Sequence, residues 1–280
     1  MNTFMRFGAG TLGDEDGVLH AVLTAGRLEL PERNITCDTT YPFDPLVLHY
    51  TISTSSEFLF AVRIPRWCKT RPTIIFDGTT TADVSRSEYH PHQLRIRVPA
   101  TKRFCFRIEL QAQVEVFHRN DGTVNIFRGP LLYASEIPFG ETTRMPRNYE
   151  DQISDCAEVA TNIDQHQWMA RVRDHELLPT GSWGIALDTS KPITVVEDDL
   201  EMSSSRDVSV WSSRTISTHL EVVAQEIEWP VEKGTAADPA SFDPNTLTKG
   251  HAFVAKLVPF ASAKLHIAQF PVLREKVAVE

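Results

Sequence analysis

The alternation of apolar and polar residues with a period of two is the feature that most constrains this chain. It runs through residues 48–52, 58–64, 94–98 and 108–116, where every second position is apolar. Successive side chains of a β-strand point to opposite faces, so this pattern is typical of strands with one face in a core and one in water. We expect residues 48–52 and 58–64 to pair as a hairpin around a turn at residues 53–56.

Turn signals separate these strands at short intervals. Asp77-Gly78 and Asn120-Asp121-Gly122 each follow an apolar segment, and we expect Gly129-Pro130 to bend a strand at a corner. A series of about eight short strands with such turns is typical of a sandwich or barrel. A second β-rich region follows, with candidate strands at residues 184–187, 193–196, 220–224 and 263–268.

The length and a local change in composition predict two domains. A chain of 280 residues can form two ordinary cores, because domains usually contain about 100–200 residues. From residue 140 to residue 167 the sequence becomes polar and charged, with a short helix expected at residues 149–160. We predict an all-β fold with few short helices: two tandem jelly-roll-like β-sandwiches, at residues 1–139 and 140–280. We also expect a flexible leader at about residues 1–16 and a long, exposed polar loop at about residues 232–250.

Composition and charge exclude several classes of protein. Hydrophobic residues make up 41% and charged residues 23% of the chain, as in ordinary globular proteins. The formal net charge of −9 would repel a nucleic acid or an anionic membrane surface. No stretch is long and apolar enough to span a membrane, and residues 1–13 lack the apolar centre of a signal peptide. As written, the chain is expected to be soluble and cytoplasmic.

The four cysteines do not form a metal or redox motif. Cys37, Cys68, Cys105 and Cys156 are separated by 31, 37 and 51 positions, whereas zinc sites and redox motifs use closely spaced pairs. We interpret them as buried thiols, although their spacing leaves a disulfide open. Asn34-Ile35-Thr36 is an N-glycosylation acceptor, which matters only in a secreted protein.

A glycine-rich motif near the start imitates a dinucleotide-binding site. Residues 8–13 read Gly-Ala-Gly-Thr-Leu-Gly, a pattern that needs a preceding strand, a following helix and a later acidic residue. Asp14, Glu15 and Asp16 follow directly and would repel a pyrophosphate at a helix start. Since no βαβ alternation surrounds the motif, we expect no bound cofactor and assign these glycines to the flexible leader.

The acidic and histidine-containing segments do not combine into a recognisable active site. Residues 197–201 are the densest acidic run, but adjacent strand residues point to opposite faces, so the run predicts no facing carboxylate pair for glycoside hydrolysis. His90-Pro91-His92 and His175-Glu176 lack a second ligand pair at a spacing that metal sites use. The local motifs of serine hydrolases, zinc proteases and phosphate-binding loops are also absent from the sequence. We predict no catalytic, cofactor-binding or metal-binding residue in this sequence.

Aromatic side chains are the remaining candidates for ligand binding, because the CH groups of a sugar ring pack on flat aromatic faces. Seven of them stand at the ends or edges of apolar segments, where an aromatic normally fills the mouth of a sandwich. These seven are Tyr41, Trp67, Tyr133, Trp168, Trp183, Trp211 and Trp229.

Three segments of the first half carry a resemblance to a known family. Residues 40–43 read Thr-Tyr-Pro-Phe, residues 60–67 contain Arg-Ile-Pro-Arg-Trp, and residues 127–133 read Phe-Arg-Gly-Pro-Leu-Leu-Tyr. Together they resemble the region that follows the catalytic barrel in the β-L-arabinofuranosidase family, glycoside hydrolase family 127. In the second half, residues 174–177, 183–188 and 257–271 are similar to the terminal domain of its fungal-type members.

The resemblance implies two β-sandwiches in tandem and a catalytic centre located elsewhere. In the family, the chemistry resides in an (α/α) barrel with a zinc-bound cysteine cluster and a glutamate acid/base. No pair of adjacent cysteines occurs here, so the resemblance transfers no catalytic or metal-binding residue. We therefore expect a chain without the barrel and without activity of its own.

Three functional hypotheses follow from these observations. The chain is a non-catalytic portion of a glycosidase that supports a catalytic barrel and contributes to self-association, or it is a free-standing carbohydrate-binding or protein-interaction module. The third hypothesis is a hydrolase whose site is assembled from residues far apart in the sequence.

Overall fold

The computed structural model describes residues 3–7, 17–43, 45–76, 87–90, 92–144, 173–197 and 218–274. In these ranges the regular structure consists of strands and two short 3-10 helices, η4 (Pro244–Thr246) and η5 (Phe260–Ser262). None of the helices in these ranges has the length and apolar character needed to cross a bilayer. The predicted all-β fold is confirmed.

The chain divides into two compact units, and each contains more than one stretch of sequence. The first unit comprises Met1–Phe117, Asn125–Tyr133 and Val195–His219, and the second comprises His118–Val124, Ala134–Thr194 and Leu220–Glu280. The single boundary near residue 140, which we expected from composition, stays a prediction.

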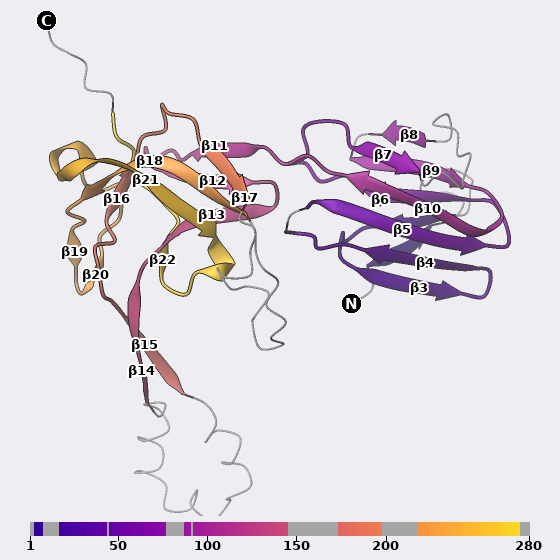
Figure 1. The fold of residues 1–280 in the computed structure, drawn as a ribbon, viewed down its shortest axis with the longest axis horizontal. Helices are drawn as coiled ribbons and strands as arrows, with labels where there is room; N and C mark the ends of the chain where they lie inside the picture. The colour runs from indigo at the N-terminus through magenta and orange to yellow at the C-terminus, as the bar shows by residue number, and fades with distance from the viewer. Residues whose placement is uncertain are drawn as a thin grey trace, which may run out of the picture. The chain divides into compact units, whose positions relative to one another are not determined.

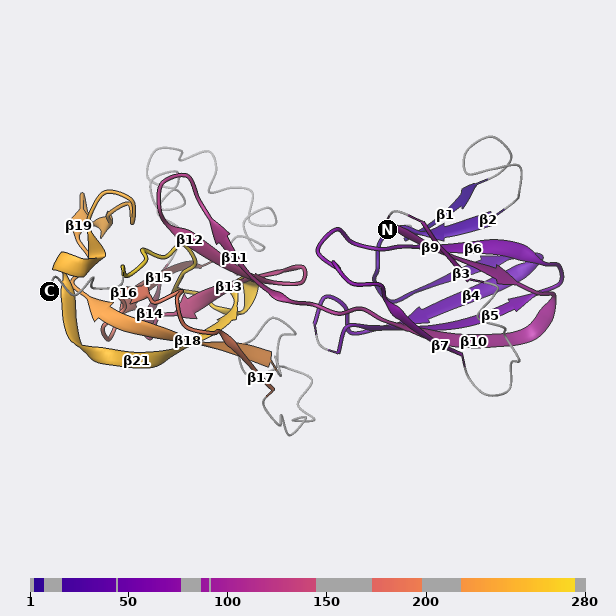
Figure 2. The same cartoon turned by 90° about the horizontal axis from the view of Figure 1, so that it is seen from above.

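Two five-stranded sheets make up the sandwich of the first unit. One has the order β1-β2-β6-β9-β8, with β1 (Phe4–Phe7), β2 (Gly17–His20), β6 (Phe58–Arg63), β9 (Gln93–Val98) and β8 (Ser87–His90). The other has the order β3-β4-β5-β10-β7, with β3 (Gly26–Leu30), β4 (Arg33–Asp38), β5 (Val47–Thr54), β10 (Thr101–Glu109) and β7 (Thr73–Phe76). Figure 1 shows β3, β4 and β5 side by side, and Figure 2 shows the two sheets as separate layers.

The alternating residues of both sheets meet in one hydrophobic core. Phe60 and Ile96 from one sheet, and Ile52 and Phe106 from the other, are almost completely buried in the same cluster. In β5 the buried positions alternate with exposed or half-buried ones, as the period of two predicts. Each such side chain contributes about 1.5–3 kcal/mol through removal of its apolar surface from water, so this core is the main source of stability in the first unit.

The predicted hairpin of residues 48–52 and 58–64 is wrong. β5 pairs with β4 and β10, whereas β6 pairs with β9 and, in parallel, with β2. The two strands therefore belong to opposite sheets and face the same core. An alternating pattern fixes which side of a strand is buried, but it does not identify the neighbouring strand.

One polar cluster lies inside this core. The imidazole of His20 is completely buried, its Nδ1 lies 2.7 Å from the hydroxyl oxygen of Tyr50, and its ring stacks on Phe4 with centroids 4.4 Å apart. Burial lowers the pKa of His20 to about 4, against the opposite influence of backbone groups at Thr24 and Val22. Burial likewise raises the pKa of the Cys37 thiol to about 12. Both side chains are therefore neutral near pH 7.

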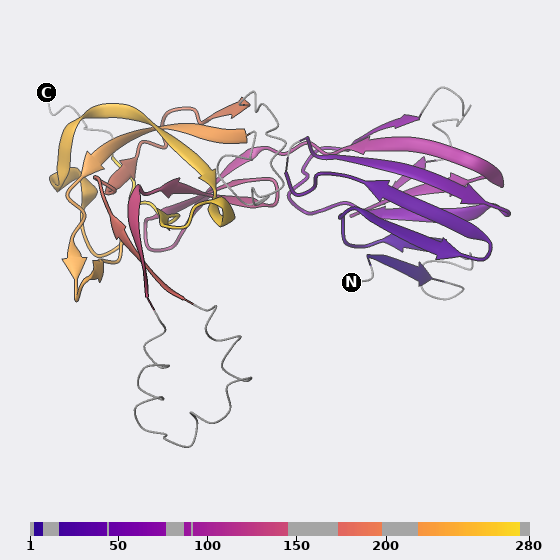
Figure 3. The same ribbon diagram turned by 60° about the horizontal axis from the view of Figure 1, so that its bottom comes forward.

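The third sheet has the order β11-β12-β13-β21-β18-β16, with β17 paired to β18 and β22 paired to β13. Its strands are β11 (Val114–His118), β12 (Val124–Arg128), β13 (Leu131–Glu136), β16 (Ile185–Leu187), β17 (Thr194–Glu197), β18 (Thr218–Ile227), β21 (Thr248–Pro259) and β22 (His266–Ile267). Two smaller pairs complete the structure: β14 (Phe139–Arg144) with β15 (Asp174–Pro179), and β19 (Val231–Glu232) with β20 (Thr235–Ala236). Figure 3 shows β14 and β15 as a narrow ribbon of two strands.

Two further predictions need correction at the start of this sheet. The alternating segment 108–116 is divided between β10, which ends at Glu109, and β11, which begins at Val114. Gly129-Pro130 forms the turn of a hairpin in which Arg128 pairs with Leu131, so it does not bend a continuous strand. The predicted turn at residues 120–122 is confirmed, since Gly122 takes a φ of +83° between β11 and β12.

The aromatic residues of the second unit form a small core of their own. The rings of Trp183 and Trp229 have centroids 5.6 Å apart, and Phe242 packs edge-on against Trp229. The indole N–H of Trp229 donates to the carbonyl of Ala237 at 2.9 Å. β20, η4 and the start of β21 lie within residues 232–250, where we expect a long, exposed polar loop, and β1 lies within the expected leader at residues 1–16. Both expectations stay predictions.

Candidate functional site

A small cavity opens beside Trp67 in the first unit, and we call it the Trp67 pocket. Its volume is about 130 Å³. All of its lining residues belong to the first unit: Trp67, Lys69, Gln113, Val114, Glu115, Phe127 and Gly129. The pocket thus combines the turn after β6 with the start of β11 and the end of the β12 region.

The turn after β6 holds the indole of Trp67 in place. Pro65 has no N–H to continue the strand, and its carbonyl accepts a hydrogen bond from the backbone N–H of Cys68 at 3.1 Å. Trp67 also hydrogen-bonds with Tyr41. Burial raises the pKa of the Tyr41 hydroxyl, while this bond and the charge of Arg63 oppose the rise. Two of the segments that carry the family resemblance therefore contact each other here.

Gly129 brings the third of these segments to the pocket. Its φ of +56° lies in the left-handed region, which favours glycine. A Cβ at this position would lie 3.0 Å from the Cβ of Ala112 and 3.6 Å from Cε3 of Trp67. The absence of a side chain therefore allows the hairpin to approach Trp67 closely and leaves the cavity open.

The walls and the rim of the Trp67 pocket differ in polarity. Trp67, Val114 and Phe127 are half-buried and form the apolar side, whereas Lys69, Gln113 and Glu115 are exposed. The apolar surface continues onto β11, where Phe117 is 52% exposed and packs edge-on against Phe127 with centroids 6.4 Å apart.

The lining of the Trp67 pocket contains few groups that could act as an acid or a base. Glu115 is its only carboxylate, whereas ordinary glycoside hydrolysis uses two carboxyl groups on opposite sides of the scissile bond. Throughout the residues that the structure describes, no group of three or more His, Cys, Asp or Glu side chains is arranged to hold a metal ion.

His175, a histidine candidate from the sequence, pairs with a glutamate on the β14–β15 ribbon. Its Nδ1 lies 2.5 Å from Oε1 of Glu141, and Nζ of Lys264 lies 3.3 Å from Oε2 of the same carboxylate. Hydrogen bonds from His175 and then Lys264 lower the pKa of Glu141. A carboxylate held ionised in this way is a poor general acid, so we interpret the cluster as a brace for the ribbon.

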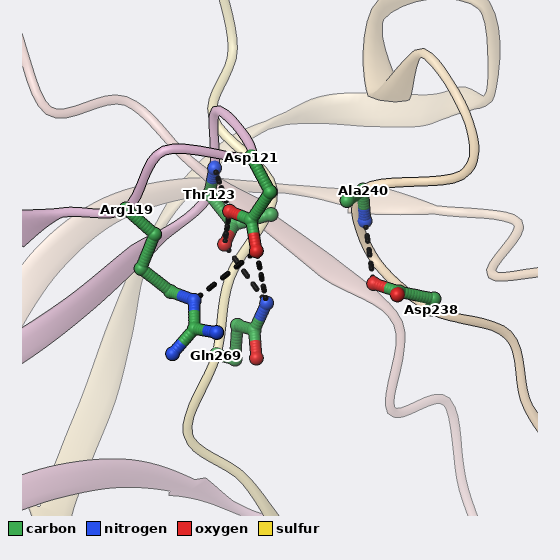
Figure 4. A network of polar contacts seen from close by, with 6 residues as sticks. All are labelled: Arg119, Asp121, Thr123, Asp238, Ala240 and Gln269. Atoms are coloured by element: carbon green, nitrogen blue, oxygen red, sulfur yellow. Dashed lines mark hydrogen bonds and ion pairs between the residues drawn. The ribbon is translucent and has the colours of Figure 1, made fainter.

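A second polar network connects the turn between β11 and β12 to the C-terminal region, as Figure 4 shows. Asp121 accepts hydrogen bonds from the side chain and backbone of Thr123 and from Nε of Arg119. The amide of Gln269 donates to both Asp121 and Thr123, at 3.3 and 2.9 Å. The bonds from Thr123, followed by Arg119, lower the pKa of Asp121 to about 2. The polar groups of Asp121 and Thr123 thus find their hydrogen-bond partners within the protein, which indicates a structural role.

The other predicted candidates do not meet in one place. Glu197 ends β17 and is exposed, and residues 198–201 lie outside the described residues. His92 is exposed with a φ of +63°, while Pro91 and the side chain of His90 are not described. The glycine motif at residues 8–13 and the acids at residues 14–16 also lie outside the described ranges. The strands that flank this motif, β1 and β2, are antiparallel neighbours, unlike the parallel strands of a dinucleotide-binding unit.

The cysteines and aromatic residues that the sequence singles out differ in how deeply they are buried. Cys37, Cys68 and Cys105 are free and buried, which confirms the interpretation as buried thiols, while Cys156 lies outside the described residues. Asn34 is exposed on β4. Tyr133 and Trp229 are core residues, whereas Tyr41, Trp67 and Trp183 are half-buried. Trp168 and Trp211 lie outside the described ranges.

Sequence reasoning identified Trp67 but missed the rest of its pocket. The alternating pattern places Gln113 and Glu115 on a strand without indicating a pocket, and the sequence around Lys69 and Phe127 carries no binding motif. One signal in the sequence is that Phe117 falls on the same face as Glu115, where the alternating pattern expects a polar residue. The approach of β12 to Trp67 depends on tertiary structure, and no local signal predicts it.

Comparison with known proteins gives structural but no sequence matches. No protein-family model matches the sequence, and no curated protein matches it. The fold is similar to a GH127 β-L-arabinofuranosidase from Geobacillus stearothermophilus T6, with a TM-score of 0.51, 14% identity and coverage of 94% of this chain and 34% of that chain. A protein described as a glycoside hydrolase gives a TM-score of 0.53 at 14% identity, over 92% of this chain and 36% of the other. A GH127 β-arabinofuranosidase gives a TM-score of 0.51 at 13% identity, over 92% of this chain and 35% of the other.

These matches define the class of fold. The chain spans about a third of the length of the solved structures that it matches, and almost all of its own length takes part. At such low identity the likeness concerns the arrangement of the strands. It agrees with the resemblance to a part of the family 127 proteins that the sequence indicates.

Proposed function

We propose that this chain is the accessory, β-rich part of a glycoside hydrolase of the β-L-arabinofuranosidase type, and that it supports a catalytic domain on another segment of polypeptide. One observation carries the proposal: more than nine-tenths of this chain matches only about a third of each solved hydrolase. The remaining two thirds of such a protein provide room for a separate catalytic domain.

The site geometry supports this division of labour. Within the described residues, the Trp67 pocket contains one carboxylate and no cysteine or histidine, and Glu141 is held ionised by two basic partners. Neither arrangement provides a facing acid and base for a glycosidic bond. We include in the proposal that the whole protein acts on an arabinofuranoside, because two of its structural relatives are arabinofuranosidases.

Two assays test this proposal together. The isolated chain is incubated with 4-nitrophenyl β-L-arabinofuranoside, and we expect no release of nitrophenolate above the blank. The native protein is then isolated from its source with an antibody against this chain, and its peptides are identified by mass spectrometry. We expect peptides of a catalytic glycosidase domain, joined to this chain or bound to it, and hydrolysis of the same substrate.

Either of two results would overturn the proposal. One is turnover by the isolated chain that survives repurification and depends on its own residues. The other is a native protein of 31.5 kDa that carries no further domain, binds no glycosidase and hydrolyses no arabinofuranoside.

A further inference from the structure

We propose that the Trp67 pocket is a binding site for a single neutral sugar ring. This inference concerns a binding site and is independent of the proposed accessory role. It gives a definite location to the carbohydrate-binding hypothesis that the aromatic content of the sequence suggested.

The polarity of the pocket matches the two kinds of surface on a sugar ring. Trp67 and Phe127 present aromatic surface at the cavity, and the CH groups of a sugar pack favourably on such surface. Lys69, Gln113 and Glu115 also line it and are exposed residues. Their ammonium, amide and carboxylate groups provide both donors and acceptors for hydroxyl groups at the edge of the ring.

The charges of the pocket favour a neutral ligand. Lys69 contributes one positive and Glu115 one negative charge to the same lining, so a charged ligand would meet an unfavourable partner as well as a favourable one. Phosphates and acidic sugars therefore gain no net electrostatic attraction. Hydroxyl groups can bond to both charged side chains, and such bonds are stronger than those between neutral groups.

The size of the pocket limits the ligand to one ring. Its volume of about 130 Å³ is slightly below that of a cavity of about 150 Å³ that accepts benzene, and well below the roughly 300–1,000 Å³ of sites for larger ligands. A five- or six-membered sugar ring fits this limit if its hydroxyl groups point toward the rim. A longer glycan would extend beyond the cavity, where the exposed ring of Phe117 offers a further surface.

The pocket is formed in advance of binding. Tyr41 and the turn at Pro65 fix the position of Trp67, and Gly129 keeps the space beside the indole free. Pre-organisation of this kind reduces the loss of side-chain freedom on binding. A ligand of about ten heavy atoms still reaches only a dissociation constant on the order of 1 mM.

Nuclear magnetic resonance provides the test. The 15N-labelled chain is titrated with methyl β-L-arabinofuranoside and, separately, methyl β-D-glucopyranoside, each up to 50 mM, and the tryptophan indole signals are followed. Trp67→Phe identifies the indole signal of Trp67. We expect this signal to shift saturably with at least one glycoside, while glycerol at the same concentration leaves it unmoved.

Rim variants connect the signal to the pocket. Lys69→Ala and Glu115→Gln alter exposed side chains, and each should weaken binding by about fivefold through loss of one hydrogen bond. Lys102→Ala, a matched change of an exposed lysine on β10 that does not line the pocket, should bind like the parent chain. The chain's unchanged spectrum outside the altered site verifies that each variant is folded.

Two results would refute the inference: no saturable shift of the Trp67 signal with either glycoside, or equal affinity in Lys69→Ala, Glu115→Gln and the parent chain. Both leave the accessory role untouched, because that role is tested by the composition and activity of the native protein. Conversely, if the native protein proved to have no glycosidase domain, the result of the titration would still stand.

Discussion

Acidification should destabilise the first unit through His20. The imidazole is completely buried and its pKa is lowered from 6.5 to about 4. Above pH 6.5 the ring is neutral in both the folded and the unfolded chain, so its contribution does not change. Between pH 6.5 and 4 the unfolded chain binds a proton that the folded chain excludes. The free energy of unfolding therefore falls by about 1.4 kcal/mol per pH unit, and by about 3 kcal/mol in total.

A non-titrating variant separates this effect from all other ionisable groups. His20→Gln retains a side chain with donors and acceptors next to Tyr50 but binds no proton. It should be less stable than the parent chain at pH 7.5, and this difference should shrink by about 3 kcal/mol at pH 4. Urea unfolding at pH 7.5, 6.5, 5.5, 4.5 and 4 measures the difference. Amide signals of β5 and β10 report on the first unit alone.

His49→Gln is the matched control. His49 is exposed on the same strand as the buried Tyr50, so its replacement should leave the pH dependence of the parent chain in place. If the stability difference between His20→Gln and the parent chain is constant from pH 7.5 to 4.5, then the buried imidazole does not control this dependence and the reasoning fails.

Three further substitutions test other parts of the structure. Gly129→Ala should lower the free energy of unfolding by more than Gly122→Ala does. Both positions have a positive φ, but only at position 129 would the added Cβ meet a neighbour, the side chain of Ala112. Equal losses in urea unfolding would contradict this. Asp121→Asn should lower the melting temperature at pH 7. The difference in melting temperature from the parent chain should narrow as the pH falls from 4 toward 2, because the parent carboxylate then also loses its charge. A difference that does not change with pH would argue against the ionised network. Trp229→Phe should cost about 1–3 kcal/mol, because the buried carbonyl of Ala237 loses its donor, and a stability equal to the parent's would show that the bond is dispensable.

The sequence predicted the strands more reliably than their neighbours. In β9 the buried Leu94, Ile96 and Val98 alternate with Arg95 and Arg97 as the period of two requires, and Gly122 forms the turn that its sequence indicates. Partner choice in a sheet depends on contacts between distant segments. No local pattern could therefore show that β6 lies parallel to β2.

The limits of prediction at the candidate site have the same origin. Trp67 was recognisable because an aromatic after Pro65 stands at the end of an apolar segment. Its contact with Gly129 arises from a hairpin turn with positive φ, where the sequence alone suggested a bend within a strand. The pocket depends on this approach of two segments, so its lining could be determined only in three dimensions.

The β14–β15 ribbon holds two distant positions of the chain next to each other. Arg144 and Asp174 stand opposite each other in the ribbon, and the register continues to Phe139 and Pro179. The chain therefore leaves the ribbon and returns to it at two adjacent points. The entropic cost of closing such a connection grows only slowly with its length. The pairing of Arg144 with Asp174 therefore fixes the spacing of the two points that any connection between these strands must join.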